Sequence, residues 1–184
     1  MNRIAGLMLA SGIALSGMAQ MKGENTVMVG GEAMYPKKDI ISNAVNSKDH
    51  TTLVAAVKAA GLVETLQGPG PFTVFAPVNN AFEDLPAGTV DNLLKPENKG
   101  QLAGVLTYHV VSGRMDFAAI AAEIKKGKGD ALLTTVAGGK LKATMNGMHN
   151  IVLTDAKGRT ANISTYDVVQ SNGVIHVLDA VLLP

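Results

Sequence analysis

The hydrophobic pattern of this chain changes period once, and that change constrains the fold more than any other feature. Before residue 130, apolar residues recur every three or four positions, as in residues 53–60, which is typical of amphipathic helices. From Asp130 onward the period is two, and residues 140–144 alternate between polar and apolar side chains. Helices followed by strands predict an α+β fold in which a mostly antiparallel sheet packs against helices.

Residues 72–82 predict the one strand of the helical half, followed by a short helix. Aromatic and β-branched residues dominate the run that starts at Phe72, as is typical of a strand. Pro77 cannot donate to a sheet ladder, so we expect the strand to end there. Asn79 or Asn80 is expected to cap the helix that follows.

Caps and turn residues bound the other predicted elements. Gly61 is expected to end the helix over residues 53–60, and Asp116 to cap a helix over residues 117–124. Strands are expected at residues 132–136, 140–144, 151–153, 161–169 and 174–183. The Asn172-Gly173 pair is a strong signal for a hairpin between the last two strands.

The first 19 residues are predicted to be a signal peptide. They contain a basic start at Arg3, an apolar run and small residues before a cleavage site, which we place between Ala19 and Gln20. The run is shorter than the roughly 20 apolar residues that a membrane span needs, and glycines interrupt it. The alternative is an uncleaved N-terminal anchor. Residues 20–36 are predicted to be a flexible linker, and residues 37–184 to form one domain.

The charge balance excludes several classes of partner. Removal of residues 1–19, whose only charged side chain is Arg3, leaves 15 basic and 15 acidic residues. A neutral domain has no electrostatic footprint for nucleic acid and no polybasic patch for anionic lipid, so we expect neither nucleic acid nor membrane as a partner after cleavage. The chain has no cysteine, which excludes disulfides, so the domain must be stable from packing alone.

Three blocks of sequence stand in a characteristic order: residues 72–82, Tyr108-His109-Val110-Val111, and the C-terminal residues 172–184. In this order they resemble the fasciclin (FAS1) domain in its secreted, single-domain bacterial form, over residues 39–184. The resemblance implies a wedge-shaped β-sandwich of about seven strands with helices packed on one side. It also implies an extracellular module for adhesion or matrix binding, and in animal members the region around the tyrosine-histidine motif is linked to integrin binding.

One position departs from the family pattern. Members commonly carry a threonine directly after the proline of the first motif, where this chain has Val78. A hydroxyl that could bond the motif's histidine is therefore missing, and Asn79 is the residue that could replace it.

Tyr108, His109 and Asn79 are the candidate binding residues, and each also has a structural interpretation. His109 lies seven residues after Leu102 on an apolar helical face, which favours a buried ring whose nitrogens are hydrogen-bonded, to a backbone group or to Asn79. Tyr108 is likewise expected to be a packed ring with a bonded hydroxyl.

The remaining histidines and the serines do not suggest an enzyme. His50 is interpreted as part of a helix cap, and His176 as an ordinary strand residue that faces away from its apolar neighbours. No pair of histidines has metal-ligand spacing, and no serine lies in a nucleophile-elbow pattern. We therefore expect no catalytic residue, no metal and no cofactor.

The sequence thus favours an exported, non-enzymatic module of the cell surface, secreted or periplasmic, that binds a protein, surface or matrix ligand. It is expected to be a monomer or a weak homo-oligomer. The alternative is an envelope stress-response or small-ligand binding protein. An enzyme is the weakest of the three hypotheses. A concave pocket with convergent polar groups would favour the second or third hypothesis, and an exposed apolar patch would favour the first.

Overall fold

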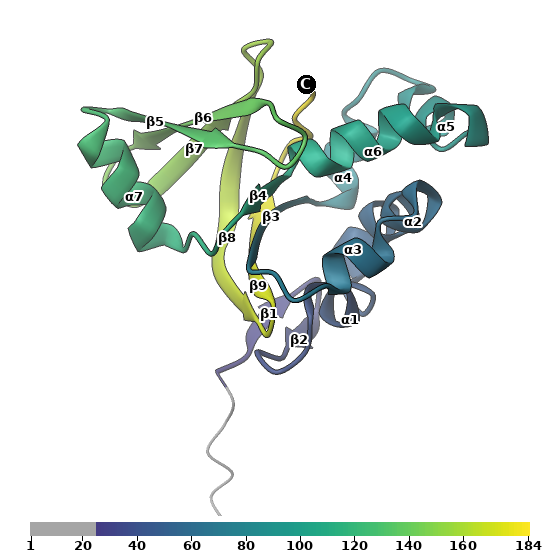
Figure 1. Cartoon of the computed structure of the whole chain (residues 1–184), viewed down its shortest axis with the longest axis horizontal. Coiled ribbons are helices and arrows are strands. Elements are labelled where there is room, and N and C mark those ends of the chain that lie inside the picture. The colour runs from purple at the N-terminus through teal and green to yellow at the C-terminus, as the bar shows by residue number, and fades with distance from the viewer. Residues whose placement is uncertain (1–24) are drawn as a thin grey trace, which may run out of the picture.

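Strands β3 and β9 form the wall around which the chain is built, and they pair in parallel although they are about a hundred residues apart in sequence (Figure 1). The structure, a computed structural model, describes residues 25–184. The strands are β1 Val27–Val29, β2 Glu32–Met34, β3 Phe72–Pro77, β4 Val110–Ser112, β5 Asp130–Thr134, β6 Lys140–Asn146, β7 Asn150–Thr154, β8 Thr160–Gln170 and β9 Gly173–Leu178. The helices are α1 Ile40–Ala44, α2 Thr51–Ala60, α3 Val63–Gln67, α4 Asn79–Glu83, α5 Thr89–Leu93, α6 Lys99–Tyr108 and α7 Phe117–Lys126, with short 3-10 turns η1 Lys48–His50 and η2 Pro96–Asn98.

Seven strands form one curled sheet in the order β4-β3-β9-β8-β7-β6-β5. Every neighbouring pair except β3–β9 is antiparallel. Two register shifts interrupt the pairing of β8 with β9, and Asp167 has a positive φ of 56° there, as expected where bulges bend a strand. The curl brings the two edge strands together, and Val111 of β4 forms an isolated bridge with Thr135 just after β5.

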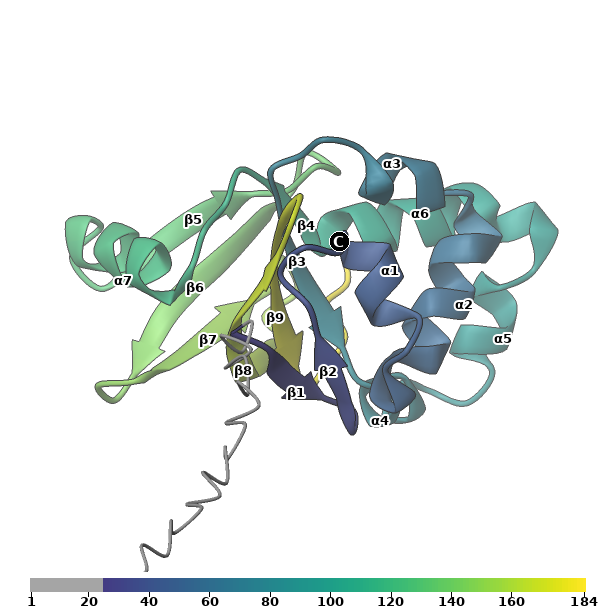
Figure 2. The same ribbon diagram turned by 90° about the horizontal axis from the view of Figure 1, so that it is seen from below.

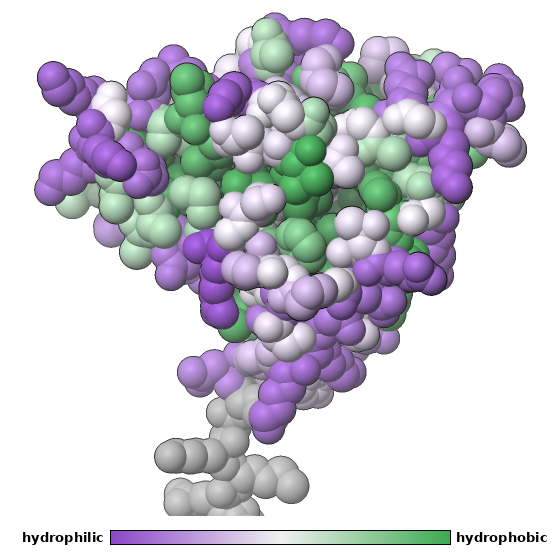
Figure 3. Space-filling view, in the orientation of Figure 1, coloured by the Kyte–Doolittle hydropathy of each residue, from purple (hydrophilic) through white to green (hydrophobic). Residues whose placement is uncertain are grey.

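The predicted α+β class is confirmed, with seven mostly antiparallel strands and helices α1–α6 on one side of the wall (Figure 2). Helix α7 packs separately against β5 and β6. The outline narrows from the end that carries β5 and α5 to the end at the β1–β2 hairpin, as the predicted wedge requires (Figure 3).

The two faces of the wall bury two different cores, because side chains alternate along β3 and β9. Val74 and Ile175 point to one face, while Phe75 and Leu178 point to the other. The helix core lies between the wall and the helices, and its buried members are Val29, Met34, Ile40, Ile41, Leu53, Ala56, Val57, Ala60, Leu66, Val74, Ala76, Ala81, Phe82, Leu93, Leu102, Val105, Leu106, Val110, Val168, Ile175, Val177 and Val181. The sheet core lies inside the curl, and its buried members are Phe75, Tyr108, Val111, Ile120, Ile124, Ala131, Leu133, Leu141, Ala143, Ile151, Leu153, Ala161, Ile163, Leu178 and Leu182.

The segment predicted to be a flexible linker, residues 20–36, contains an ordered hairpin instead. Strands β1 and β2 pair with each other, and Met34 is buried in the helix core. The linker interpretation failed because it took the two glycines as a sign of flexibility. Gly30 and Gly31 have φ values of 60° and 77°, which are the positive values that a two-residue hairpin turn demands. The predicted cleavage between Ala19 and Gln20 lies outside the described residues.

The predicted caps and strand ends hold at some places and fail at others. Asp116 caps α7 as predicted, through a side-chain oxygen that accepts from the N–H of Ala119 at 2.8 Å, and Asp39, for which no cap was predicted, caps α1 in the same way at 2.9 Å. Gly61 ends α2 in the left-handed conformation. The last strand was predicted over residues 174–183, but β9 ends at Leu178. The residues beyond it leave the ladder, and Leu182 and Leu183 donate their backbone N–H groups to the side chains of His109 and Asp155.

Candidate functional site

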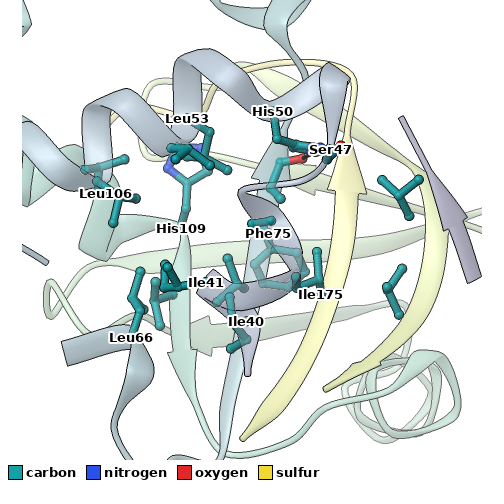
Figure 4. Close-up of a pocket in the computed structure, with 18 of the residues that line it drawn as sticks. Ile40, Ile41, Ser47, His50, Leu53, Leu66, Phe75, Leu106, His109 and Ile175 are labelled. Carbon is teal, nitrogen blue, oxygen red and sulfur yellow. Dashed lines mark hydrogen bonds between the residues drawn. The ribbon is translucent and has the colours of Figure 1, made fainter. Parts of the chain in front are cut away.

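Tyr108 and His109 lie at the junction between α6 and β4, and they point into different cores. Tyr108 is the last residue of α6, and its ring is buried in the sheet core. His109 follows as the C-cap, and its ring lies on the helix-core side, next to Leu53 and Leu106 (Figure 4). The motif therefore joins the two halves of the molecule.

Both ring nitrogens of His109 are bonded to backbone groups, so the predicted burial and hydrogen bonding of this ring are confirmed. Leu182 donates its backbone N–H to Nε2 at 3.0 Å, and Nδ1 lies 2.9 Å from the carbonyl oxygen of Val105. Because Nε2 must accept and a carbonyl can only accept, the ring is neutral with its proton on Nδ1. Burial lowers the pKa of His109 from 6.5 to about 4.

Tyr108 is a packed ring with a bonded hydroxyl, as predicted. The hydroxyl donates to the carbonyl oxygen of Lys140 at 2.8 Å and accepts from the N–H of Ala156 at 3.2 Å. Burial raises the pKa of this phenol above its ordinary value. The ring packs so closely over Gly139 that a Cβ there would lie 2.6 Å from it.

Asn79 is not bonded to His109, and neither Asn79 nor Asn80 caps the helix α4 that follows the strand. The N-cap of α4 is Val78, which offers no side-chain bond. Asn79 instead spans to α2: its Oδ1 accepts from the N–H of Thr52 at 3.0 Å, and its Nδ2 donates to the carbonyl oxygen of Lys48 at 2.8 Å. It therefore caps the start of a helix distant in sequence, which local spacing cannot reveal.

A cavity lies in the helix core between the wall and helices α1 and α2 (Figure 4). We call it the helix-core cavity; its volume is about 50 Å³. Val29 and Met34 of the hairpin contribute to its walls, as does His109. Its full lining is Val29, Met34, Ile40, Ile41, Ala44, Ser47, His50, Leu53, Val54, Val57, Lys58, Val63, Leu66, Val74, Phe75, Ala76, Leu106, His109, Val110, Val168 and Ile175.

His50 also lines this cavity, and its interpretation as a helix cap is wrong. The ring is buried and makes no capping bond to α2. Its Nδ1 lies 2.8 Å from the hydroxyl of Ser47, and its Nε2 lies 3.3 Å from the carbonyl oxygen of Ala76 on β3. Burial lowers the pKa of His50 below its ordinary value. The ring ties the start of α2 to the wall.

His176 faces away from Ile175 and Val177 as predicted, but it is not an ordinary strand residue. Its ring is fully buried, stacks on Phe75 with centroids 5.6 Å apart, and places Nε2 at 2.8 Å from the carbonyl oxygen of Met115. The predicted alternation along β9 is confirmed, but the side that His176 faces is buried as well, because both faces of β9 are covered.

The side chains of Asn172 and Asp155 join segments that are distant in sequence, and the sequence analysis did not predict this role. The Asn172 side chain accepts from the N–H of Ile40 at 3.0 Å and donates to the carbonyl oxygens of Leu66 and Gly68 at 2.7 and 2.9 Å. The sequence analysis interpreted Asn172 only as a hairpin-turn residue before Gly173, so its hydrogen bonds to α1 and to the end of α3 were not predicted.

Asp155 holds the chain end. Its carboxylate accepts from the N–H of Leu183 at 3.0 Å and pairs with Arg159 at 3.0 Å. Burial alone would raise the pKa of Asp155, but hydrogen bonds from the N–H groups of Leu183, Arg159 and Lys157 outweigh it, and the pKa is lowered. The segment after β9 is thus fixed by two side chains, Asp155 and His109.

The buried polar side chains of the described region are therefore used for internal bonds. No buried side-chain nitrogen or oxygen in residues 25–184 lacks a hydrogen-bond partner. Within the same residues, no group of three or more acidic, histidine or cysteine side chains is placed to hold a metal ion. None of the helices there combines the length and apolar character that a membrane span requires. What the site offers a ligand is an apolar cavity.

Comparison with known proteins identifies the domain. The family model described as the fasciclin domain matches residues 48–184. Protein sll1483 of Synechocystis is 44% identical over 95% of this chain and 90% of its own length. The cell surface glycolipoprotein MPB83 of Mycobacterium bovis is 31% identical over 91% of this chain and 70% of its own length.

A solved structure of a FAS1 domain pair from the insect cell adhesion molecule Fasciclin I has a similar fold. Its TM-score is 0.71 over 81% of this chain and 52% of that chain, at 16% sequence identity.

Proposed function

Because this chain belongs to the fasciclin domain family, we propose that it is an exported, non-enzymatic module that attaches to a protein, surface or matrix ligand outside the cytoplasm. The names of two similar proteins support this role, since one is a cell surface glycolipoprotein and the other a cell adhesion molecule. Tyr108, His109 and Asn79 contribute by holding the domain in shape, because their polar atoms are already bonded inside it.

The observation that carries the proposal is an exposed apolar area, which we call the front patch. It is centred on Val136, which is 45% exposed and has the half-buried Leu62 and Phe72 beside it, and it is approached by Leu132, which is 65% exposed and lies four residues earlier on the edge strand β5. Figure 3 shows apolar residues gathered on this face, in the region of β4 between the helices and the sheet. Exposed apolar patches on otherwise polar surfaces mark interaction sites.

Retention of the purified domain on immobilised envelope and host-surface fractions tests the proposal. Changing Leu132 and Val136 together to lysine should reduce retention at least about tenfold, since central apolar contacts carry most of the binding energy of an interface. The matched control is Met148→Lys, at an 84% exposed position in the β6–β7 turn, which should bind as the parent does. Equal retention of both variants would contradict the assignment of the front patch.

Export has its own test. The basic start and apolar run support cleavage between Ala19 and Gln20, and a secreted or periplasmic product. The intact mass of the protein recovered from the exported fraction should correspond to residues 20–184. A species that retains residues 1–19 would support the anchored alternative.

The second candidate function is small-ligand binding. The helix-core cavity favours it for an apolar group, because apolar side chains enclose it, although it lacks the free convergent polar groups that most small-molecule sites contain. The cavity lies in the helical half of the molecule. None of the front-patch residues lines it. The two functions can therefore be tested separately.

A further inference from the structure

The helix-core cavity offers a ligand no hydrogen bond, and this defines the part of a ligand that can enter. Its buried polar wall groups are the rings of His50 and His109 and the hydroxyl of Ser47. The two nitrogens of each ring are engaged by other protein groups, and the hydroxyl bonds to His50. A polar group placed inside would lose its bonds to water without replacement, so only an apolar group is accepted.

The open side of the cavity has a different character. The wall residues that are not fully buried include Ala44 of α1, Val54 and Lys58 of α2, and Val63 of α3, so these three helices surround the mouth. Lys58 is exposed and is the one charged side chain in the lining. Within residues 25–184 it takes part in none of the ion pairs. Because the lining surface is almost wholly apolar, Lys58 lines the cavity with its methylene stem, and its ammonium group extends toward solvent. An apolar interior with one flexible cation beside its opening is complementary to an anionic amphiphile.

We propose that the helix-core cavity binds the apolar end of a short-chain aliphatic carboxylate, whose head group lies at Lys58. This rests on the second candidate function, small-ligand binding, and specifies its ligand class. A free fatty acid is the simplest molecule with this chemistry.

The volume limits the length of chain that is buried. A cavity needs about 10–15 Å³ to hold one water-sized group. A cavity of about 50 Å³ therefore takes an apolar end of roughly three or four heavy atoms, such as an isopropyl group. Met34 closes one wall from the β1–β2 hairpin, and its removal would lengthen the space. Affinity should therefore rise with chain length only until the cavity is filled.

Titration of the full domain with linear carboxylates from butyrate to octanoate tests this, followed by methyl NMR. Each methylene that enters should raise affinity roughly fourfold, and the gain should stop at a short chain length. Saturable shifts are expected at methyl groups of Ile41 and Leu53, which line the cavity, and not at Leu153 in the sheet core. Shifts that grow without saturation at all three residues would show surface adsorption and overturn the proposal.

Two variants test the two ends of the ligand. Lys58→Glu should weaken carboxylate binding about fivefold, as expected for an exposed ion pair, and should favour alkyltrimethylammonium ions of the same length. Lys125→Glu on α7 is the matched control, because it changes the same charge outside the cavity. Met34→Ala should move the end of the affinity gain to a longer chain.

Titration with neutral alkanols distinguishes two errors: a wrong assignment of the head group to Lys58, and the absence of any ligand binding in the cavity. If alkanols and alkyltrimethylammonium ions bind as tightly as carboxylates, the role of Lys58 is wrong while the cavity remains a binding site. If no probe gives saturable shifts at Ile41 and Leu53, both the proposal and the small-ligand function are wrong. The surface-retention assay on the front patch is independent of either result.

Discussion

The two cores of this molecule are closed in different ways. The sheet core is closed by strand alternation, and Leu141, Ile151 and Leu153 within it have no exposed surface at all. The helix core is larger and less tightly closed, because seven short elements, including the hairpin, cover it and leave a cavity. Hydrogen bonds from buried or half-buried polar side chains add to the packing of the helix core. His50, Asn79 and Asn172 each join a helix to a distant segment.

The difference shows what short helices need from the rest of the chain. Helices of five residues such as α1 and α3 are too short to be stable alone. Their ends carry backbone groups that no helical bond satisfies, and a buried asparagine can bond two such ends at once. We therefore expect polar substitutions to be most damaging in the helical half.

Asn172→Ala should show the largest effect. It would leave the N–H of Ile40 and the carbonyl oxygens of Leu66 and Gly68 without their partner, which separates α1 and α3 from the β8–β9 turn. The expected loss of unfolding free energy is about 3 to 4 kcal/mol, since each unsatisfied buried group costs roughly 1–3 kcal/mol. Urea denaturation measures it.

Asn146→Ala is the control for that measurement, because Asn146 is an exposed asparagine at the end of β6. It should change the unfolding free energy by less than about 0.5 kcal/mol. Similar midpoints for the two variants would show that the Asn172 bonds do not hold the helical half together.

His109→Ala should be the next most damaging change. It leaves the N–H of Leu182 and the carbonyl oxygen of Val105 unpaired and enlarges the cavity, at an expected cost of about 2 to 3 kcal/mol. The exposed His149 provides the control, and His149→Ala should be neutral. An unchanged urea midpoint for His109→Ala, combined with lost surface binding, would mean that His109 contacts the partner directly.

Acid should weaken the helical half through the same ring. Burial lowers the pKa of His109 from 6.5 to about 4, so below pH 6.5 the unfolded chain takes up a proton that the folded state refuses. The stability is complete above pH 6.5 and falls as the pH approaches 4, by about 2 kcal/mol at pH 5 for this group. His50 and His176 shift in the same direction.

Urea midpoints at pH 7.5 and pH 5 measure this loss. A His109→Gln variant, whose side chain does not titrate, should lose less stability between the two pH values than the parent. An identical loss in both proteins would assign the acid sensitivity to other groups.

The sequence predicted the parts of the structure that follow from periodicity. The change of period at Asp130 marks the start of β5, and the cap Asp116 and the stop at Gly61 are local signals that hold. The burial of Tyr108 and His109 followed from the apolar face of α6.

The hydrogen bonds between distant segments could not be predicted, because the two partners of each bond lie far apart in sequence. Asn79 bonds a residue 27 positions earlier, and Asn172 bonds one 132 positions earlier. A hairpin glycine pair and a linker glycine pair look alike until the strands beside them pack, which is why Gly30 and Gly31 were misinterpreted. The helix-core cavity depends on how Met34 of that hairpin packs, so no local pattern indicates it.

Tyr108→Phe should have the smallest effect, and it tests whether the sheet core also depends on polar ties. The phenylalanine ring keeps the packing over Gly139, while the carbonyl oxygen of Lys140 and the N–H of Ala156 lose the hydroxyl. Ala156 lies in an exposed turn where water can replace that bond, so we expect a loss of only about 1 kcal/mol in urea denaturation. Tyr35→Phe, at a 40% exposed position after the hairpin, serves as the control and should be neutral. A loss as large as that of His109→Ala would show that the sheet core, too, is held by side-chain bonds between distant segments rather than by alternation alone.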